Sequence, residues 1–338
     1  MNPSPLHAQH AGLHLVDYDG GQVPAHYGDP DTELDALQSG CGILDLSPVA
    51  IVRLSGADTR RFANAQLSHN IRDLPTGGLR HCVITDRKGR IEGMADALLV
   101  EDRELILLGA GSSAEWLIER LDSFIIMDPL ELEDLGQDLA LMSLQGPGAE
   151  AVALALGVPL PERAVARWAG GYVARNDRCA AGGVDLLAPA SDWPALWQAA
   201  VAAGARPCGV EALEAARVLR GLPRWPQDMG ERAFIHEMRL VSRVAAFDKG
   251  CYIGQEVINR METMGKVNRQ LMGLQIEGQG TAGDAVVLGD QAVGTLSSVA
   301  RAGGRTLGLA VLRTAAGPGS DVFIGEQRAP ARVCELPF

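Results

Sequence analysis

Residues 247–257 concentrate the side chains that are best suited to chemistry. They read Phe-Asp-Lys-Gly-Cys-Tyr-Ile-Gly-Gln-Glu-Val, so that Gly250 and Gly254 bracket a Cys-Tyr-Ile triplet. Glycine permits positive φ and close backbone approach, which favours a tight turn that presents Cys251. Lys249, two residues earlier, favours the thiolate of Cys251 if the two side chains converge. The spacing therefore makes this segment the first candidate for a functional centre.

Two interpretations of Cys251 stay open on local chemistry alone. A lone cysteine beside an isoleucine is commonly a small buried hydrophobic residue. Alternatively, it is a redox or transfer nucleophile, or one ligand at a shared site, since an iron–sulfur cluster usually takes four ligands and one cysteine cannot hold it. The following residues, Gln255 to Ile258, read as the start of a helix, where the dipole favours Glu256.

The composition describes a chain that buries a core without a partner. Of its 338 residues, 47% are hydrophobic and 21% charged, and the length suggests two or three domains. The net charge of −12 and the 4% aromatic content disfavour direct nucleic-acid binding. Met1–His10 has no charged start followed by an apolar run, and no apolar stretch is long enough to span a bilayer. A cytoplasmic protein that does not contact membranes is expected.

The charges and the cysteines add two further expectations. Residues 217–269 hold ten basic and six acidic side chains, a basic island that suits an anionic small molecule or a local acidic partner, or is simply a solvated charged face. The six cysteines are scattered, without a C-x-x-C pair or zinc spacing, so we expect no stably bound metal and no disulfide framework.

A strand followed by a crossing helix occurs twice. Residues 49–54 read as a strand before Gly56 and a helix capped by Asp58, and residues 139–144 as a strand before Gly146 and a second helix. Between them lie short strands and a helix opened by the capping box at residues 112–115. This degenerate repeat predicts an α+β fold with helices on one side of a sheet.

From Leu271 onward the pattern changes to six short strands between glycine-rich turns, which is typical of a small β-barrel. We therefore expect four parts: an irregular N-terminal segment over 1–45, a first α+β domain over 46–157, a second over 158–270 that carries the cysteine motif, and a C-terminal barrel over 271–338. Nothing in the sequence demands an oligomer, so a monomer is expected.

The string K-G-C-Y-x-G-Q-E over 249–256, followed by Arg260 and later by Asn268-Arg269, resembles the signature of the YgfZ-like family of folate-binding proteins. The resemblance covers most of the chain. Shorter motifs resemble the wider aminomethyltransferase (glycine-cleavage T-protein) superfamily: Leu54-Ser55-Gly56, Leu144-Gln145-Gly146-Pro147, the R-x-x-x-G helix at Arg217, Phe234-Ile235-His236-Glu237, and Val293-Gly294.

The resemblance implies a three-domain ring around a central folate pocket, with a ferredoxin-like first part and the terminal barrel. It also implies a cofactor, tetrahydrofolate or a one-carbon derivative. The function that it implies is folate-binding support of iron–sulfur cluster assembly or repair, and of iron–sulfur-dependent tRNA modification. Iron–sulfur enzymes or cluster-assembly proteins would be the partners, and any effect on tRNA would be indirect.

Within that reading, Cys251 is the reactive or cluster-contacting thiol, and Lys249 tunes it or meets an anion. Tyr252 packs or contacts the pterin, and Gln255 holds the loop in register. The remaining candidates for folate are Arg217 and Arg269, as bidentate partners of its glutamate tail or as structural salt bridges, and Glu237, as an acceptor for pterin N–H groups or a turn cap.

Two departures from the T-protein pattern leave alternatives open. The catalytic aspartate of those enzymes has one counterpart here, Asp96, and only if two residues are inserted before it. The G-Y-T-G-E motif, whose glutamate binds the pterin, is absent at residues 175–183. A tetrahydrofolate-dependent aminomethyltransferase with Asp96 as its carboxylate is therefore the first alternative, and a non-catalytic interaction module is the second.

Overall fold

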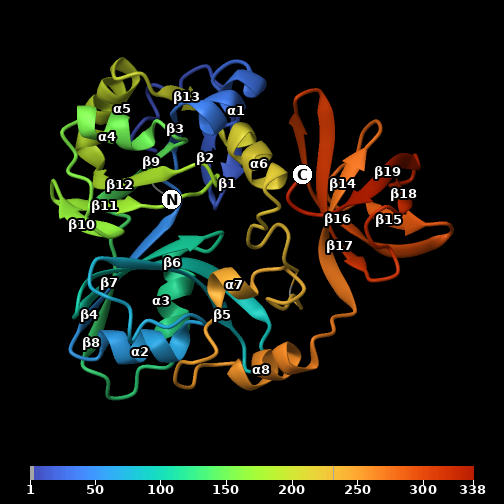
Figure 1. Ribbon diagram of the computed structural model, residues 1–338. Helices are drawn as coiled ribbons and strands as arrows, with labels where there is room; N and C mark the ends of the chain where they lie inside the picture. The colour runs from blue at the N-terminus through green and yellow to red at the C-terminus, as the bar shows by residue number, and fades with distance from the viewer. Residues whose placement is uncertain (1–3, 231) are drawn as a thin grey trace.

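The protein consists of two antiparallel-rich sheets and a closed barrel that surround a common centre (Figure 1). The computed structural model describes residues 4–230 and 232–338. Two expectations therefore fall partly outside the described residues: Met1–Pro3 of the N-terminal segment and Glu231 of the basic island.

The first sheet has five strands in the order β5-β6-β7-β4-β8, and all neighbours are antiparallel. Phe62 of α2 and Leu117 and Leu121 of α3 pack with sheet residues in one core. Both helices therefore cover one face, and the opposite face looks toward the centre of the molecule (Figure 1). The elements are β4 (Ala50–Gly56), α2 (Thr59–Gln66), β5 (Gly78–Thr85), β6 (Ile91–Glu101), β7 (Glu104–Ala110), α3 (Ala114–Asp122) and β8 (Leu130–Asp134).

The second sheet has six strands in the order β10-β11-β12-β9-β3-β13, and β13 pairs with β3 in parallel. Helices α4 and α5 pack on one face through Val152, Trp193 and Trp197. Helices α1 and α6 pack against each other nearby. The elements are α1 (Pro30–Ser39), β3 (Gly42–Asp45), β9 (Leu139–Gln145), α4 (Ala149–Ala155), β10 (Val165–Trp168), β11 (Gly171–Arg175), β12 (Gly183–Pro189), η1 (Ala190–Asp192), α5 (Trp193–Ala202), β13 (Arg206–Cys208) and α6 (Val210–Leu219).

The C-terminal strands close into a barrel in the order β14-β17-β16-β15-β18-β19, with β19 paired back to β14. Alternate residues point inward and form a separate apolar core. The expected terminal barrel and the α+β character of the fold are therefore confirmed. Its strands are β14 (Arg269–Ile276), β15 (Ala285–Leu288), β16 (Gln291–Ala302), β17 (Arg305–Arg313), β18 (Asp321–Ile324) and β19 (Ala329–Cys334).

Long irregular stretches join the second sheet to the barrel and carry the cysteine motif. The described residues between 220 and 254 contain one short helix, α7 (Val241–Val244), and the motif ends at α8 (Gln255–Met264). Gly254 precedes α8 with a φ of 82°, and a Cβ there would lie 2.6 Å from the Asp86 carbonyl oxygen. The turn before α8 therefore requires glycine.

The expectation of an irregular N-terminal segment is wrong for residues 15–45. They form the hairpin β1 (Leu15–Tyr18) and β2 (Gly21–Pro24), then α1 and β3. The start of α1 has a standard cap, because the carboxylate of Asp29 accepts the backbone N–H of Thr32 and Pro30 stands at the first turn. The two sheets also interleave along the chain. Strand β3 precedes the five-stranded sheet, whereas β9, which pairs with both β3 and β12, follows it.

Candidate functional site

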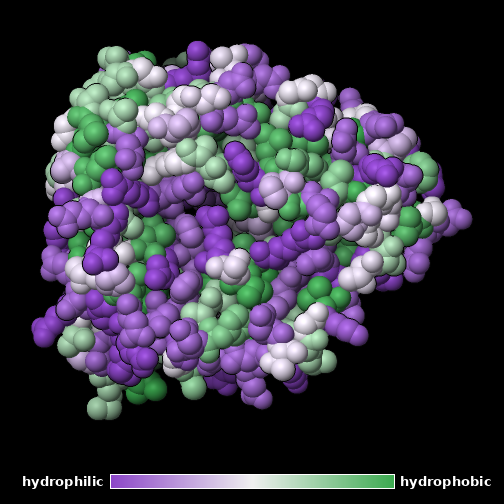
Figure 2. Space-filling view, in the orientation of Figure 1, coloured by the Kyte–Doolittle hydropathy of each residue, from purple (hydrophilic) through white to green (hydrophobic). Residues whose placement is uncertain are grey.

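The two sheets face each other across a small polar cavity, which we call the inner cavity. Its volume is about 130 Å³, and the polar groups on its wall come from both sheets and from the segment after α6. A larger opening of about 1030 Å³, the outer cleft, shares Tyr18, Asp19, Val49 and Arg224 with the inner cavity. Figure 2 shows a hollow bordered by hydrophilic residues at the centre of this face.

Asp96 lies on the wall of the inner cavity. It stands directly opposite His81 in the β5–β6 pair, and residues opposed in this way share a face of the sheet. Oδ1 of Asp96 is 2.7 Å from Nδ1 of His81, and Oδ2 accepts a hydrogen bond of 2.8 Å from the amide of Asn176. Burial alone would raise the pKa of Asp96, but His81, the charge of Arg178 and the Asn176 amide together hold it well below its usual range. Asp96 is therefore an ionised carboxylate.

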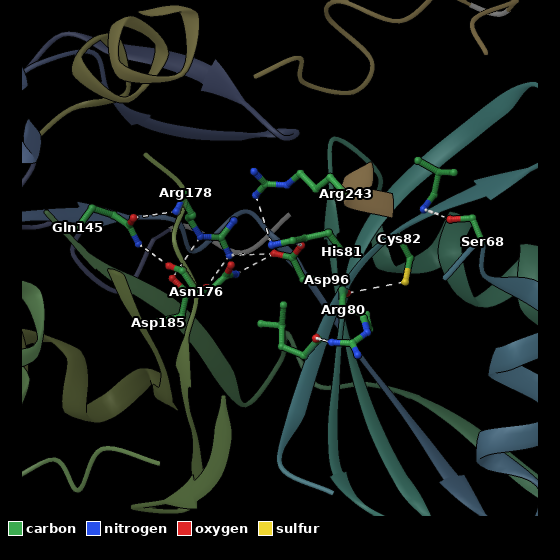
Figure 3. A network of polar contacts seen from close by, with 12 residues as sticks. Ser68, Arg80, His81, Cys82, Asp96, Gln145, Asn176, Arg178, Asp185 and Arg243 are labelled. Atoms are coloured by element: carbon green, nitrogen blue, oxygen red, sulfur yellow. Dashed lines mark hydrogen bonds and ion pairs between the residues drawn. The ribbon is translucent and has the colours of Figure 1, made fainter. Parts of the chain in front are cut away.

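Arg243, from α7, determines which ring nitrogen of His81 carries the proton. Its guanidinium lies 3.3 Å from Nε2 of His81. Arginine can only donate hydrogen bonds, so Nε2 must be the acceptor. The proton of a neutral ring then sits on Nδ1 and is donated to Asp96. Figure 3 shows this chain of contacts from Arg243 through His81 to Asp96.

The second sheet supplies a buried network behind Asn176. The Asn176 amide nitrogen also donates to Asp185 at 2.9 Å, which fixes the orientation of the side chain. Asp185 in turn pairs with the guanidinium of Arg178 through two hydrogen bonds, of 2.6 and 3.1 Å. Burial opposes the charge of Arg178, but Asp185 and Asp96 outweigh it and raise the pKa of Arg178 above its usual value. Gln145 holds the same loop through the backbone of residues 176 and 178.

Three buried polar atoms on residues of the cavity wall have no hydrogen-bond partner among the described residues. They are Oδ1 of Asn176, Nε of Arg217 and Nε of Arg224, the last of which lies 3.2 Å from Oε1 of Glu214. The Asn176 amide nitrogen faces two carboxylates, so Oδ1 is the end left over as an acceptor. Buried polar groups are usually satisfied. These atoms are enclosed by the protein and are not exposed to the open part of the cavity.

The arginines predicted for the folate tail are engaged in ion pairs. Arg217 lies in α6, is buried, and pairs with Asp228 at 2.7 Å and with Glu214. Arg269 makes a bidentate pair with Glu237, with distances of 2.8 and 3.0 Å. Arg217 lines the inner cavity, whereas Arg269 and Glu237 hold the start of the barrel to the segment before α7. Of these three candidates, only Arg217 is placed beside the cavity.

Lys249 is buried and acts as an anchor for the motif. Its ammonium donates to the backbone carbonyls of Asn64, Leu67 and His69 at the end of α2. An ammonium has three N–H donors, so none is left for the sulfur of Cys251. Burial lowers the pKa of Lys249 to about 8, and its charge lies 4.6 Å from the centre of the Tyr252 ring. The side chain therefore fixes the loop rather than reaching the thiol.

The other residues of the motif either anchor the loop, as Lys249 does, or are exposed. Cys251 is exposed, whereas Tyr252 is buried with a hydroxyl that has no partner among the described residues. Oε1 of Gln255 accepts the backbone N–H of Tyr252, which keeps the turn in register. Thr85 binds the carbonyl of Ile253 at 2.6 Å and joins the loop to β5. The motif thus presents one thiol on a firmly held loop, apart from the inner cavity.

His81, Asn176, Arg178 and Arg243 are site residues that sequence reasoning missed. Arg243 lies inside the basic island, which is the one sequence signal that pointed near it. Asn176 and Arg178 lie in the segment where the T-protein glutamate motif is absent. Nothing in the sequence brings them to Asp96, because the contacts join residues about 80 positions apart.

Across residues 4–230 and 232–338, no group of three histidine, cysteine, aspartate or glutamate side chains is arranged to hold a metal ion. None of the helices in the described part of the chain has the length and apolar character needed to cross a bilayer.

Residues 6–165 match the family model of the GCVT N-terminal domain. The whole chain is similar to curated proteins named aminomethyltransferase. It is 28% identical to that of Bordetella pertussis, with 100% of this chain and 96% of the relative covered. It is 29% identical to that of Nitrosococcus oceani, covering 97% and 91%. The fold is that of the glycine cleavage system aminomethyltransferase T from Bartonella henselae, with a TM-score of 0.88, 18% identity, and coverage of 99% and 97%.

Proposed function

We propose that the chain is a member of the GcvT-like aminomethyltransferase superfamily, that it binds tetrahydrofolate or a one-carbon derivative of it, and that it supports one-carbon transfer next to Asp96. The observation that carries this proposal is the carboxylate of Asp96, held by His81 and Asn176 on the wall of a cavity that shares residues with a larger cleft. Tetrahydrofolate supplies the nitrogen that carries the one-carbon unit.

The cavities fit such a ligand in size and in polarity. Small-molecule sites usually occupy about 300–1,000 Å³. The outer cleft, at about 1030 Å³, accommodates a folate, whereas the inner cavity of about 130 Å³ does not hold a whole one. Tyr18 forms part of the wall between them, with the Arg224 guanidinium 4.3 Å from its ring centre.

The chemistry of Asp96 indicates its role. A carboxylate whose pKa is held this low is a weak base, so it does little to remove a proton near neutral pH. It is well suited to balance positive charge on an amine or iminium nitrogen as the one-carbon unit moves. His81 and Asn176 keep it ionised and fixed in orientation.

The test combines binding with turnover. Titration calorimetry with tetrahydrofolate should show binding to the wild-type protein, to Asp96→Asn and to Cys251→Ala. Turnover with an aminomethyl donor should be lost in Asp96→Asn and kept in Cys251→Ala. If the wild-type protein fails to bind folate at millimolar concentration, the proposal is wrong and a non-catalytic interaction module remains.

A second function is proposed on a different observation, the exposed Cys251 on its anchored loop. In this function the protein acts in the cytoplasm, as a monomer, in support of iron–sulfur enzymes or cluster-assembly proteins. Its effect on tRNA modification is then indirect. In cells lacking the wild-type gene, Cys251→Ala should fail to restore the activity of an iron–sulfur-dependent tRNA-modifying enzyme, while Asp96→Asn restores it. The opposite pattern would favour the transferase.

A further inference from the structure

A second large opening lies between the barrel and the irregular segment that precedes α7. Its volume is about 1020 Å³, and we call it the barrel groove. Residues within 226–238 line one wall, and residues of β14, β16 and β17 line the other (Figure 1). It shares none of its described lining residues with the inner cavity, and it has only Pro226 and Gln227 in common with the outer cleft. The barrel groove is therefore separate from the site around Asp96.

Three arginines of the groove wall lie close together. Arg269, the first residue of β14, stands directly opposite Arg313, the last residue of β17, in the antiparallel pair. Residues opposed in this way share a face, with Cβ atoms about 5 Å apart. The guanidinium of Arg269 also donates to the backbone carbonyl of Arg232 at 2.9 Å, which places the third arginine next to the pair. Three positive charges therefore gather in one part of the groove.

The nearby carboxylates do not balance these charges. Glu237 pairs with Arg269, but both Nη1 donors of Arg269 stay unused among the described residues, and its side chain is 41% exposed. Arg232 and Arg313 are exposed and pair with no described carboxylate. Asp228, the one acidic side chain among the described lining residues, is buried in an ion pair. Three arginines and one paired glutamate leave two positive charges without compensation.

The facing pair of Arg269 and Arg313 is unfavourable for the barrel itself. Like charges directly opposite each other on neighbouring strands destabilise a sheet. The side chain of Arg313 makes no hydrogen bond to a described residue that would offset this repulsion. A charge that lowers stability without a contact in the protein is typical of a binding position, where function is kept at the expense of stability.

The wall of the groove limits the kind of anion that it suits. A guanidinium fork matches a planar carboxylate or a phosphate. None of the described lining residues is aromatic, so no side chain is available to stack on a nucleobase. None of them begins a helix, the usual element at a phosphate site. Aliphatic side chains such as Ala233, Ala292 and Val311 complete the wall. These features favour carboxylates carried on an aliphatic chain.

We propose that the barrel groove is a second binding site, for an extended aliphatic ligand with at least two carboxylate groups, which bind at Arg232, Arg269 and Arg313. The groove has room for such a ligand, since small-molecule sites usually occupy about 300–1,000 Å³. The carboxylates can come from two sources. One is a free polycarboxylate, which is independent of the proposed function. The other is a chain of glutamates on a folate in the outer cleft, and only this source rests on the proposed function.

The first test is titration calorimetry on the full chain with tricarballylate, glutarate and glutaramide, which carry three, two and no carboxylates. Tricarballylate should bind more tightly than glutarate, and added salt should weaken both. Glutaramide should not bind, and pyrophosphate should bind less tightly than tricarballylate. The proposal is overturned if tricarballylate fails to bind at millimolar concentration, if glutaramide matches glutarate, or if pyrophosphate binds more tightly than tricarballylate.

Variants locate the binding. Arg313→Met should weaken tricarballylate about 5-fold, as expected for one exposed ion pair, and should not lower the free energy of unfolding, because it removes the repulsion from Arg269. Arg313→Lys should recover part of the affinity, because it keeps the charge and loses the fork. Arg305→Met, an exposed arginine at the other end of β17, is the matched control and should behave as wild type. Unchanged affinity together with lost stability in Arg313→Met would make the residue structural and disprove the site.

Tetrahydrofolate with one and with three γ-linked glutamates distinguishes the two sources. If the ligand is a free polycarboxylate, tricarballylate should bind equally well in the presence of either form. If it is the glutamate chain, the triglutamate form should displace tricarballylate and bind more tightly than the monoglutamate form, and Arg313→Met should abolish this difference. Either result supports the carboxylate site. Binding of tricarballylate without any binding of folate would remove the proposed function and keep the barrel groove.

Discussion

Nη1 of Arg217 lies 2.7 Å from Oδ2 of Asp228, and both side chains are buried. Asp228 also accepts hydrogen bonds from Ser297 and Ser298 of β16. This pair therefore ties α6, which packs against α1, to the barrel. Removing one member of a buried ion pair leaves the other charge without compensation.

We expect Arg217→Met to lower the free energy of unfolding by about 3–5 kcal/mol. Denaturant unfolding measures the change, and Arg220→Met, an exposed neighbour in the same segment, should stay within about 0.5 kcal/mol of wild type. If Arg217→Met keeps its stability and loses folate affinity instead, the guanidinium belongs to the ligand site and not to the joint between α6 and the barrel.

Lys249→Met should destabilise the protein by about 2–4 kcal/mol, because three carbonyl groups lose the buried ammonium that they share. Hydrogen exchange should become faster in residues 64–69 and 248–253, and the barrel should be unaffected. The exposed Lys266→Met serves as the control. Normal exchange in both segments of Lys249→Met would show that the lysine is not an anchor.

The lowered pKa of His69 predicts that the protein loses stability in mild acid. Burial, with the charges of Arg80 and Lys249, lowers the pKa of His69 to about 4, below the value of about 6.5 in an unfolded chain. Between these values the unfolded state binds more protons, so the free energy of unfolding falls as the pH drops through that window. The geometry agrees, because Nδ1 of His69 accepts the Asn70 backbone N–H at 2.7 Å and cannot be protonated while it does so.

The free energy of unfolding should therefore differ less between about pH 7 and about pH 5 in His69→Gln than in wild type. His14→Gln, an exposed histidine, should leave the difference unchanged. An identical pH dependence in wild type and His69→Gln would rule out this histidine as the source.

Thiol labelling should distinguish Cys251 from the other five cysteines. Cys41, Cys82, Cys179 and Cys208 are buried, and burial raises the pKa of Cys41 to about 11 and of Cys82 to about 12. The thiolate is the reactive form. In the native protein we expect one fast-reacting thiol, a slower one from the half-buried Cys334, and all six after denaturation. The fast phase should vanish in Cys251→Ala, and its persistence there would contradict the exposure of this loop.

The elements that were predictable from sequence are those with strong local signals. The six barrel strands alternate between inward and outward residues and are separated by glycines. Their positions therefore follow from the two-residue alternation and from the glycines in the turns. The helix after Ser112 is also local, because its cap, Ser113 accepting the Trp116 N–H, lies within one turn. The hairpin β1–β2 was missed although β15 and β18 are equally short, because β1 and β2 form a sheet of their own and do not belong to a run of regularly spaced strands.

The site was predictable only in part, for a related reason. Asp96 could be proposed from its place in a strand, but the groups that hold it come from β5, the loop after β11, and α7. Lys249 shows the same limit. Its spacing suggested an effect on Cys251, whereas its direction is set by carbonyls about 180 residues earlier. Sequence spacing fixes which residues are near in the chain and not which tertiary partners they meet.

Because the two sheets interleave along the chain, they can form only at different stages of translation. All strands of the five-stranded sheet lie between Ala50 and Asp134, so this sheet can form as soon as that stretch has left the ribosome. Strand β3 is made earlier but needs β9 on one side and β13 on the other, and Cys208, the last residue of β13, is translated much later. The six-stranded sheet can therefore be completed only after the whole five-stranded sheet has been translated, and Arg243, which lines the cavity between them, is translated later still.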